Sequence, residues 1–164
     1  MTGLCLCSLG IMLGFIGYWI WRTKEVPDSV SSLIHYLEGK GWIWSSWLVV
    51  VSVTLMIPLI ENLGVNTKFF GFLTVLCLIG TAITPIIRED TYRLHVWFGR
   101  FAGIFSQVCV ALLCPWWLLV WLLFIACMGS VLIDALPKKL TGKGLFIIEV
   151  LCAVSLYGSL LTSL

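Results

Sequence analysis

Charged residues are scarce in this chain. Only 11% of its 164 residues are charged, whereas soluble domains usually carry about 25%. Hydrophobic residues make up 60%, and a soluble fold of this length could not hide so much apolar surface in its core. The net charge of +2 and the lack of long basic runs argue against nucleic-acid binding. The composition therefore indicates an integral membrane protein whose apolar surface is covered by lipid.

Signatures of catalysis and metal binding are also missing. The chain has no GxSxG, HExxH or CxxC motif, and its only histidines are His35 and His95. Its seven cysteines do not follow the spacing of zinc ligands and most lie within apolar runs, so we interpret them as packing residues. We therefore expect no cofactor and no resident metal, and we favour a protein that is not an enzyme.

The apolar sequence divides into six pieces of helix length. About 20 apolar residues cross the hydrocarbon core of a bilayer as a helix. Short gaps rich in Gly, Pro and charged residues separate the pieces, which makes consecutive helices antiparallel neighbours. The predicted spans are about 4–21, 42–60, 69–87, 94–113, 116–136 and 145–161. The predicted fold class is therefore all-α: a polytopic transmembrane bundle that forms a single domain over residues 1–164.

Basic residues are distributed unevenly between the two ends of this predicted bundle. Eight of the ten lie in or beside the first, third and fifth connections, one lies on the other side, and Arg100 lies within a span. An excess of Lys and Arg is typical of cytoplasmic connections. We therefore expect both termini outside and the connections 22–41, 88–93 and 137–144 in the cytoplasm. The location we expect is a bacterial cytoplasmic membrane.

The first connection is long enough to hold a short helix of its own. Four of its apolar residues follow the i, i+3, i+4, i+7 spacing of one helix face: Val30, Leu33, Ile34 and Leu37. We expect an amphipathic α-helix over about 29–38 that lies on the cytoplasmic surface of the membrane. His35 would then lie on its polar face.

Two charged residues fall inside the predicted spans, where a charge is costly and usually has a function or a partner. Arg100 lies seven residues beyond Arg93, which is about 10 Å along a helix. Glu149 lies six residues beyond Lys143, at a similar depth from the same side. The two could bind a ligand or pair between the fourth and sixth spans. Alternatively, Arg100 extends back to the surface.

His95 stands at the cytoplasmic start of the fourth span. Gly99 and Gly103 follow at i+4 and i+8, and Ser106 lies beyond them. Small residues at this spacing allow helices to approach closely. We therefore expect this face to point into the bundle, with His95 at its mouth. There it would bind a ligand, or it would be an interfacial histidine bonded to a backbone carbonyl.

The cytoplasmic connections also permit a catalytic alternative. Its candidate residues are Ser31, His35, Asp90 and His95. They could converge as the site of a lipid-directed hydrolase or transferase, in which Arg100 meets an anionic head group. A dimeric small transporter is a further alternative, although no Gly/Pro break recurs in both halves. We favour a protein that binds lipid or a small molecule, or a subunit of a membrane complex or homo-oligomer, with no nucleic-acid partner.

Two stretches are similar to a known family. They are residues 26–31 (Val-Pro-Asp-Ser-Val-Ser) with His35, and residues 84–90 (Thr-Pro-Ile-Ile-Arg-Glu-Asp) with His95. In these stretches and in its layout the chain resembles the Frag1/DRAM-type group of small six-helix integral membrane proteins and its uncharacterised bacterial relatives. That resemblance implies a six-helix bundle with both stretches on one side of the membrane. It implies a fold rather than an activity.

Overall fold

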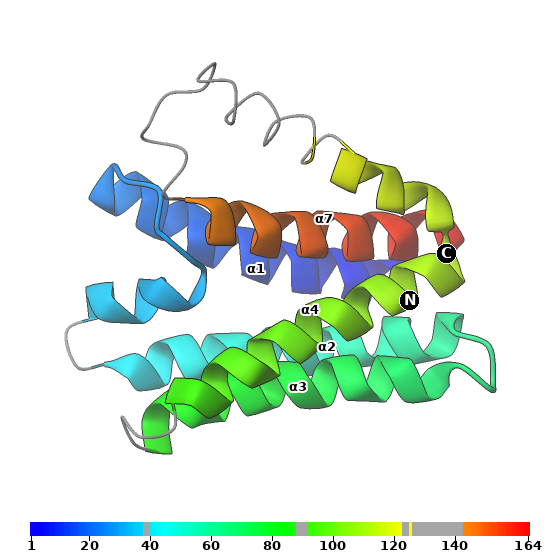
Figure 1. Ribbon diagram of the computed structural model, residues 1–164, viewed down its shortest axis with the longest axis horizontal. Helices are drawn as coiled ribbons and strands as arrows, with labels where there is room; N and C mark the ends of the chain where they lie inside the picture. Colours follow the sequence, from blue (N-terminus) through cyan, green and yellow to red (C-terminus); the bar gives the residue numbers. More distant parts are fainter. Residues whose placement is uncertain (38–39, 88–91, 123–124, 126–142) are drawn as a thin grey trace.

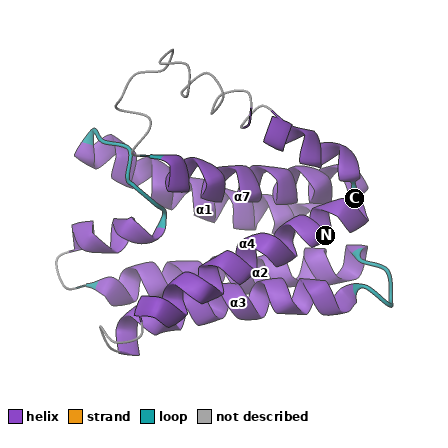
Figure 2. Ribbon diagram, in the orientation of Figure 1, coloured by secondary structure: helices purple, strands orange, loops and turns teal. Residues whose placement is uncertain are grey.

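The described part of the chain is mostly helical. A computed structural model describes residues 1–37, 40–87, 92–122, 125 and 143–164 (Figure 1). Its long helices are α1 (Thr2–Thr23), α2 (Gly41–Asn62), α3 (Lys68–Ile87), α4 (Tyr92–Leu113) and α7 (Gly144–Ser163), and two short 3₁₀-helices are η1 (Ser31–Leu37) and η3 (Pro115–Leu119) (Figure 2). The predicted fold class is confirmed: the protein is an all-α membrane bundle.

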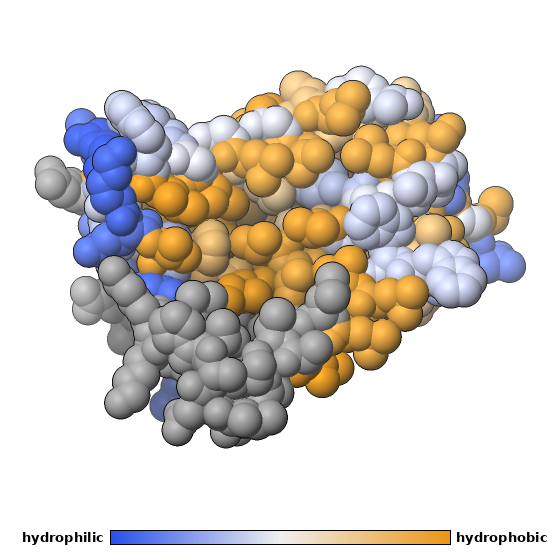
Figure 3. Space-filling model, turned by 90° about the horizontal axis from the view of Figure 1, so that it is seen from above, coloured by the Kyte–Doolittle hydropathy of each residue, from blue (hydrophilic) through white to orange (hydrophobic). Residues whose placement is uncertain are grey.

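The surface of the bundle suits a bilayer. Among the described residues, α1, α2, α4 and α7 are long and apolar enough to cross a membrane, and α3 is apolar over Lys68–Thr84. Large apolar side chains are exposed along these helices, while hydrophilic residues gather at the ends, most densely where α1 ends (Figure 3). An apolar surface of this extent marks contact with membrane rather than water.

The last helix of the bundle packs against the first. α1 packs on α2, α2 on α3 and α3 on α4, so long helices that follow one another along the chain are neighbours in the bundle. α7 packs on both α4 and α1, and it also reaches α2. Both chain termini consequently lie at the same end of the bundle (Figure 1). The last helix thus holds α1 and α4 together.

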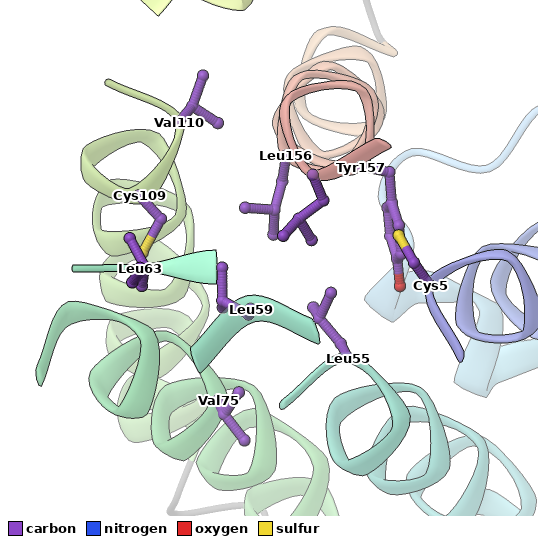
Figure 4. Close-up of a cluster of buried hydrophobic side chains, with 10 residues drawn as sticks. Cys5, Leu55, Leu59, Leu63, Val75, Cys109, Val110, Leu156 and Tyr157 are labelled. Atoms are coloured by element: carbon purple, nitrogen blue, oxygen red, sulfur yellow. The ribbon is translucent and has the colours of Figure 1, made fainter. Parts of the chain in front are cut away.

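Two clusters of buried side chains fill the bundle, one toward each end. Near the chain termini, all five long helices contribute, with Leu59, Leu156 and Tyr157 among the residues that meet (Figure 4). At the opposite end, Trp44 of α2 and Leu33 of η1 belong to the second cluster, each 1% exposed. Lipid tails are as apolar as these side chains, so close packing must favour association of the helices.

Buried polar side chains link the helices inside the membrane. The hydroxyl oxygens of Ser8 on α1 and Tyr157 on α7 lie 2.7 Å apart. On α4, the side-chain oxygen of Gln107 accepts hydrogen bonds from Ser155 of α7 (3.0 Å) and from the indole of Trp121 (2.8 Å). Hydrocarbon offers these groups no water as an alternative partner. The bonds therefore favour one arrangement of the helices over others of similar packing.

Five of the six predicted spans coincide with described helices to within two residues at each end. The fifth, over 116–136, begins in η3, and most of it lies outside the described residues. α4 ends and α7 begins at opposite ends of the bundle (Figure 1). A count of six transmembrane helices stays a prediction.

The predicted inward face of α4 is wrong at one position. Gly99 is exposed, and nothing lies within 4 Å of the position that a Cβ would take. The buried residues of α4 are instead His95, Ala102, Ser106, Cys109 and Val110. His95 and Ser106 belong to both the predicted and the observed stripe. The positions of α3 and α7 beside α4 determine which face of α4 is buried.

Gly80 on α3 is a point of close approach between helices. A Cβ at this position would lie 2.8 Å from two ring carbons of Phe98 on α4. We expect Gly80→Ala to lower the free energy of unfolding by about 1–3 kcal/mol, the usual cost of overpacking. Reversible unfolding in mixed detergent micelles, followed by circular dichroism, measures this loss.

Gly99→Ala is the matched control. It meets open space, and alanine favours a helix by about 1 kcal/mol over glycine. We expect this variant to be as stable as the wild type or slightly more stable. Equal losses in the two variants would contradict the observed face of α4.

Candidate functional site

The first connection folds back onto the bundle. The predicted short helix is present, but η1 is a 3₁₀-helix over Ser31–Leu37 rather than an α-helix over 29–38. Its apolar stripe faces the protein: Leu33 and Leu37 are 1% and 6% exposed and belong to the same cluster as Trp44. The apolar side of η1 is therefore part of the core.

Serine side chains shape the start of η1. The Ser32 amide donates to Ser29 Oγ (3.0 Å), and Ser32 Oγ donates to the Ser29 carbonyl oxygen (2.7 Å). The candidate nucleophile, Ser31, has its Oγ 3.1 Å from Ser29 Oγ. Local bonds of this kind compete with the bonds of an α-helix. They account for the late start of η1 and give Ser31 a role in a turn.

The two histidines lie in different surroundings. His35 is exposed on η1, whereas His95 is buried, with Nδ1 2.9 Å from the Thr81 carbonyl oxygen and 3.2 Å from Thr84 Oγ1. A carbonyl oxygen only accepts, so Nδ1 of His95 carries the proton and donates it. His95 is thus bonded to a backbone carbonyl, which is one of the two alternatives predicted for it. Asp90, the remaining catalytic candidate, lies outside the described residues.

Arg100 and Glu149 have separate partners. The Arg100 guanidinium lies over the ring of Trp97, 5.5 Å from its centroid, on an exposed face of α4. Glu149 Oε2 accepts a hydrogen bond of 2.5 Å from the Val30 amide. Within the part of the chain that the structure describes, neither side chain forms an ion pair. The two belong to helices that pack together, but Arg100 lies on the face of α4 that is turned away from the core.

Asp28 anchors the connection to the first turn of α7. Its carboxylate forms an ion pair with Lys143, and its carbonyl oxygen accepts a hydrogen bond of 3.1 Å from the Phe146 amide. The hydrogen bond to Asp28, supported by the charge of that carboxylate, raises the pKa of Lys143 above its ordinary value of 10.5. Connection and last helix are therefore joined through a side chain and through the backbone.

Val30 is bound by two helices at once. Its amide donates to Glu149 of α7, and its carbonyl oxygen accepts from the indole of Trp44 on α2 at 3.2 Å. The ring of Trp44 in turn lies 5.7 Å from the ring of His95, measured between centroids. The residue just before η1 is thus bonded to the beginnings of both α7 and α2.

A groove of about 560 Å³ opens at this end, between α1, η1 and the start of α2. Its aromatic lining consists of Phe15, Tyr18, Trp19 and Tyr36. Two basic residues, Arg22 and Lys40, also line it. Leu37 and Ile43 add apolar surface, and Thr23 adds a hydroxyl. The groove therefore combines positive charge with an aromatic and apolar wall.

Arg22 is held in position within this groove. Its guanidinium lies over the Trp19 ring, 5.3 Å from the centroid, and donates to the Tyr18 hydroxyl at 2.9 Å. Tyr36 of η1 stacks on Trp19 with 6.3 Å between centroids. Neither Arg22 nor Lys40 has a carboxylate partner among the described residues. Both charges are available to an anion, and that of Arg22 is pre-oriented by its aromatic neighbours.

Trp19 contributes an unsatisfied donor to this region. Its side chain is 8% exposed, and its buried Nε1 has no hydrogen-bond partner among the described residues. The groove was not predicted from the sequence, where the basic residues of the first connection served only to orient the bundle. Aromatic residues three and four positions before a basic residue at the end of a span, as in Tyr18 and Trp19 before Arg22, are the signal that points to it.

No family model, curated protein or solved structure matches this chain. Among the described residues, no group of three or more His, Cys, Asp or Glu side chains is placed to hold a metal ion. The groove is the candidate site because of its charge, its lining and its position.

We expect Asp28→Asn to return the pKa of Lys143 toward 10.5. The folded-state pKa is raised, so the ion pair stabilises the connection below the ordinary lysine pKa and is lost as the pH rises through the raised value. An alkaline NMR titration of ¹³C-labelled lysine in micelles measures the pKa in both proteins. An identical titration of Lys143 in the variant would show that Asp28 is not its partner in solution.

Proposed function

We propose that this protein binds the head group of an anionic phospholipid in the groove between α1, η1 and α2. The observation that carries this proposal is the pair of basic side chains, Arg22 and Lys40, which lack carboxylate partners among the described residues and stand beside an aromatic wall. Basic pockets between transmembrane helices are typical binding sites for anionic head groups. The proposed role is binding, not catalysis.

The position of the groove supports a lipid rather than a soluble anion. Arg22 lies in the last turn of α1, and Lys40 precedes the first residue of α2, so both charges stand where apolar helices end. Phe15 and Ile43 extend the groove toward the apolar part of the bundle. A phosphate at the basic residues would therefore leave its acyl chains beside apolar side chains.

We further propose that this end faces the cytoplasm of a bacterial cell. Most of the basic residues fall in the connections assigned to this side, and both termini lie at the opposite end of the bundle (Figure 1). Anionic lipids make the cytoplasmic leaflet negative, so basic residues are attracted to it. The protein would bind this lipid as a single chain, as a homo-oligomer, or as a subunit of a membrane complex.

The surroundings of the catalytic candidates support a binding role. A lipid hydrolase at this end would require His35 and His95 near each other and near a serine. Instead, His35 is exposed, His95 is bonded to the Thr81 carbonyl oxygen, and Ser31 belongs to a serine turn. Each side chain thus has an ordinary structural environment.

We expect Arg22→Gln and Lys40→Gln each to weaken binding of phosphatidylglycerol about fivefold, because a basic residue near the membrane surface contributes about 1 kcal/mol of attraction. Native mass spectrometry of the purified protein, titrated with phosphatidylglycerol or with phosphatidylcholine in micelles, measures the affinities. Phosphatidylcholine, which has no net charge, should bind more weakly than phosphatidylglycerol to the wild type.

Lys24→Gln is the matched control. Lys24 lies at the same end of α1, but its ammonium stands over the ring of Trp21 and it does not line the groove. We expect this variant to keep nearly the full affinity of the wild type. An equal loss in Lys24→Gln and Arg22→Gln would reduce the effect to general surface charge and remove the support for a site.

A further inference from the structure

We propose that Glu149 on α7 holds one wall of the lipid groove in place, so that the last helix controls a site that it does not line. This inference rests on the proposed lipid site. The lining of the groove comes from α1, η1 and the start of α2. One chain of contacts links α7 to the groove wall, and it runs from Glu149 through Val30 to η1.

The first contact is the hydrogen bond between Glu149 and the connection. Glu149 lies in the second turn of α7, a helix apolar enough to cross a membrane, where a carboxyl group is costly and needs a partner. Its Oε2 accepts from the Val30 amide at 2.5 Å. No other bond of that amide is present among the described residues, so the loss of Glu149 would leave a backbone donor without a partner.

The second contact leads from Val30 into η1. The Val30 carbonyl oxygen accepts from the Leu33 amide at 3.3 Å, and η1 begins one residue after Val30. Tyr36 and Leu37, at the other end of this short helix, form part of the groove wall. This short helix connects Val30 to Tyr36, so we expect a displacement at Val30 to reach the groove wall.

The third contact connects the wall with the cation. Tyr36 stacks on Trp19, and Trp19 lies beneath the guanidinium of Arg22. The position of η1 thus affects the aromatic surface that orients Arg22. The burial of Leu33 and the bond from Trp44 to Val30 also hold η1, so the loss of Glu149 should loosen the wall rather than detach it.

Two substitutions separate the hydrogen bond of Glu149 from its charge. Glu149→Gln removes any charge but keeps a side-chain oxygen that can accept from the Val30 amide. Glu149→Leu removes both. We expect Glu149→Leu to weaken phosphatidylglycerol binding about tenfold and Glu149→Gln to stay within about twofold of the wild type. The affinities are measured by native mass spectrometry, with Val154→Ala, an exposed position on α7, as the control for any change in that helix.

Hydrogen–deuterium exchange of the full chain tests the contact itself. In Glu149→Leu, amides of residues 28–37 should exchange at least tenfold faster, while those of α1 and α2 exchange as in the wild type. Glu149→Gln and Val154→Ala should leave the whole pattern unchanged. Faster exchange spread evenly over all helices would show general destabilisation and overturn the proposal.

The outcomes separate this inference from the lipid site. If binding falls in Arg22→Gln but not in Glu149→Leu, the lipid site stands and the role of Glu149 is overturned. If binding is unchanged in both, the lipid site and the inference fall together. A loss in Glu149→Gln as large as that in Glu149→Leu would also overturn the inference, because the charge rather than the hydrogen bond would then matter.

Discussion

The lack of water inside a bilayer is the constraint on which this structure depends. A buried polar group without a partner inside the protein is costly there. Serine and threonine side chains of the helices therefore bond carbonyl oxygens of their own helix, as Ser52 does to Leu48 and Thr81 does to Cys77. Where a polar group could not be satisfied within its helix, as with Gln107, it bonds a neighbouring helix and selects which helices lie side by side.

The same constraint explains the organisation of the charged end. The Val30 amide donates to Glu149 of α7, and the Val30 carbonyl oxygen accepts from Trp44 of α2. Asp28 forms an ion pair with Lys143, the residue that precedes α7. These bonds hold the first connection against the bundle, where its apolar residues join the core. The groove lies between η1, α1 and the start of α2, so its shape depends on where these bonds hold η1. The site and the fold at this end thus depend on one set of contacts.

Local properties of the chain were predictable. The ends of five helices follow from hydropathy and from Gly, Pro and charged residues, because a span is a property of about 20 consecutive residues. The choice between Gly99 and Ala102 on α4 was not predictable from spacing, since both fit a helical stripe that begins at His95. The partner of Glu149 was not predictable either. Depth along a helix suggested Arg100, but only the rotation of α4 shows that Arg100 faces outward.

By itself, the sequence determined that the protein is an all-α membrane bundle and where most of its helices begin and end. Tertiary structure alone decided that α7 packs between α1 and α4, that η1 belongs to the core, and that Arg22 and Lys40 share a groove with Tyr36. The physical reason is the distance along the chain over which each interaction acts. Hydrophobicity acts on each segment separately, whereas a binding site needs side chains from segments whose relative rotation is set by packing and by hydrogen bonds between helices.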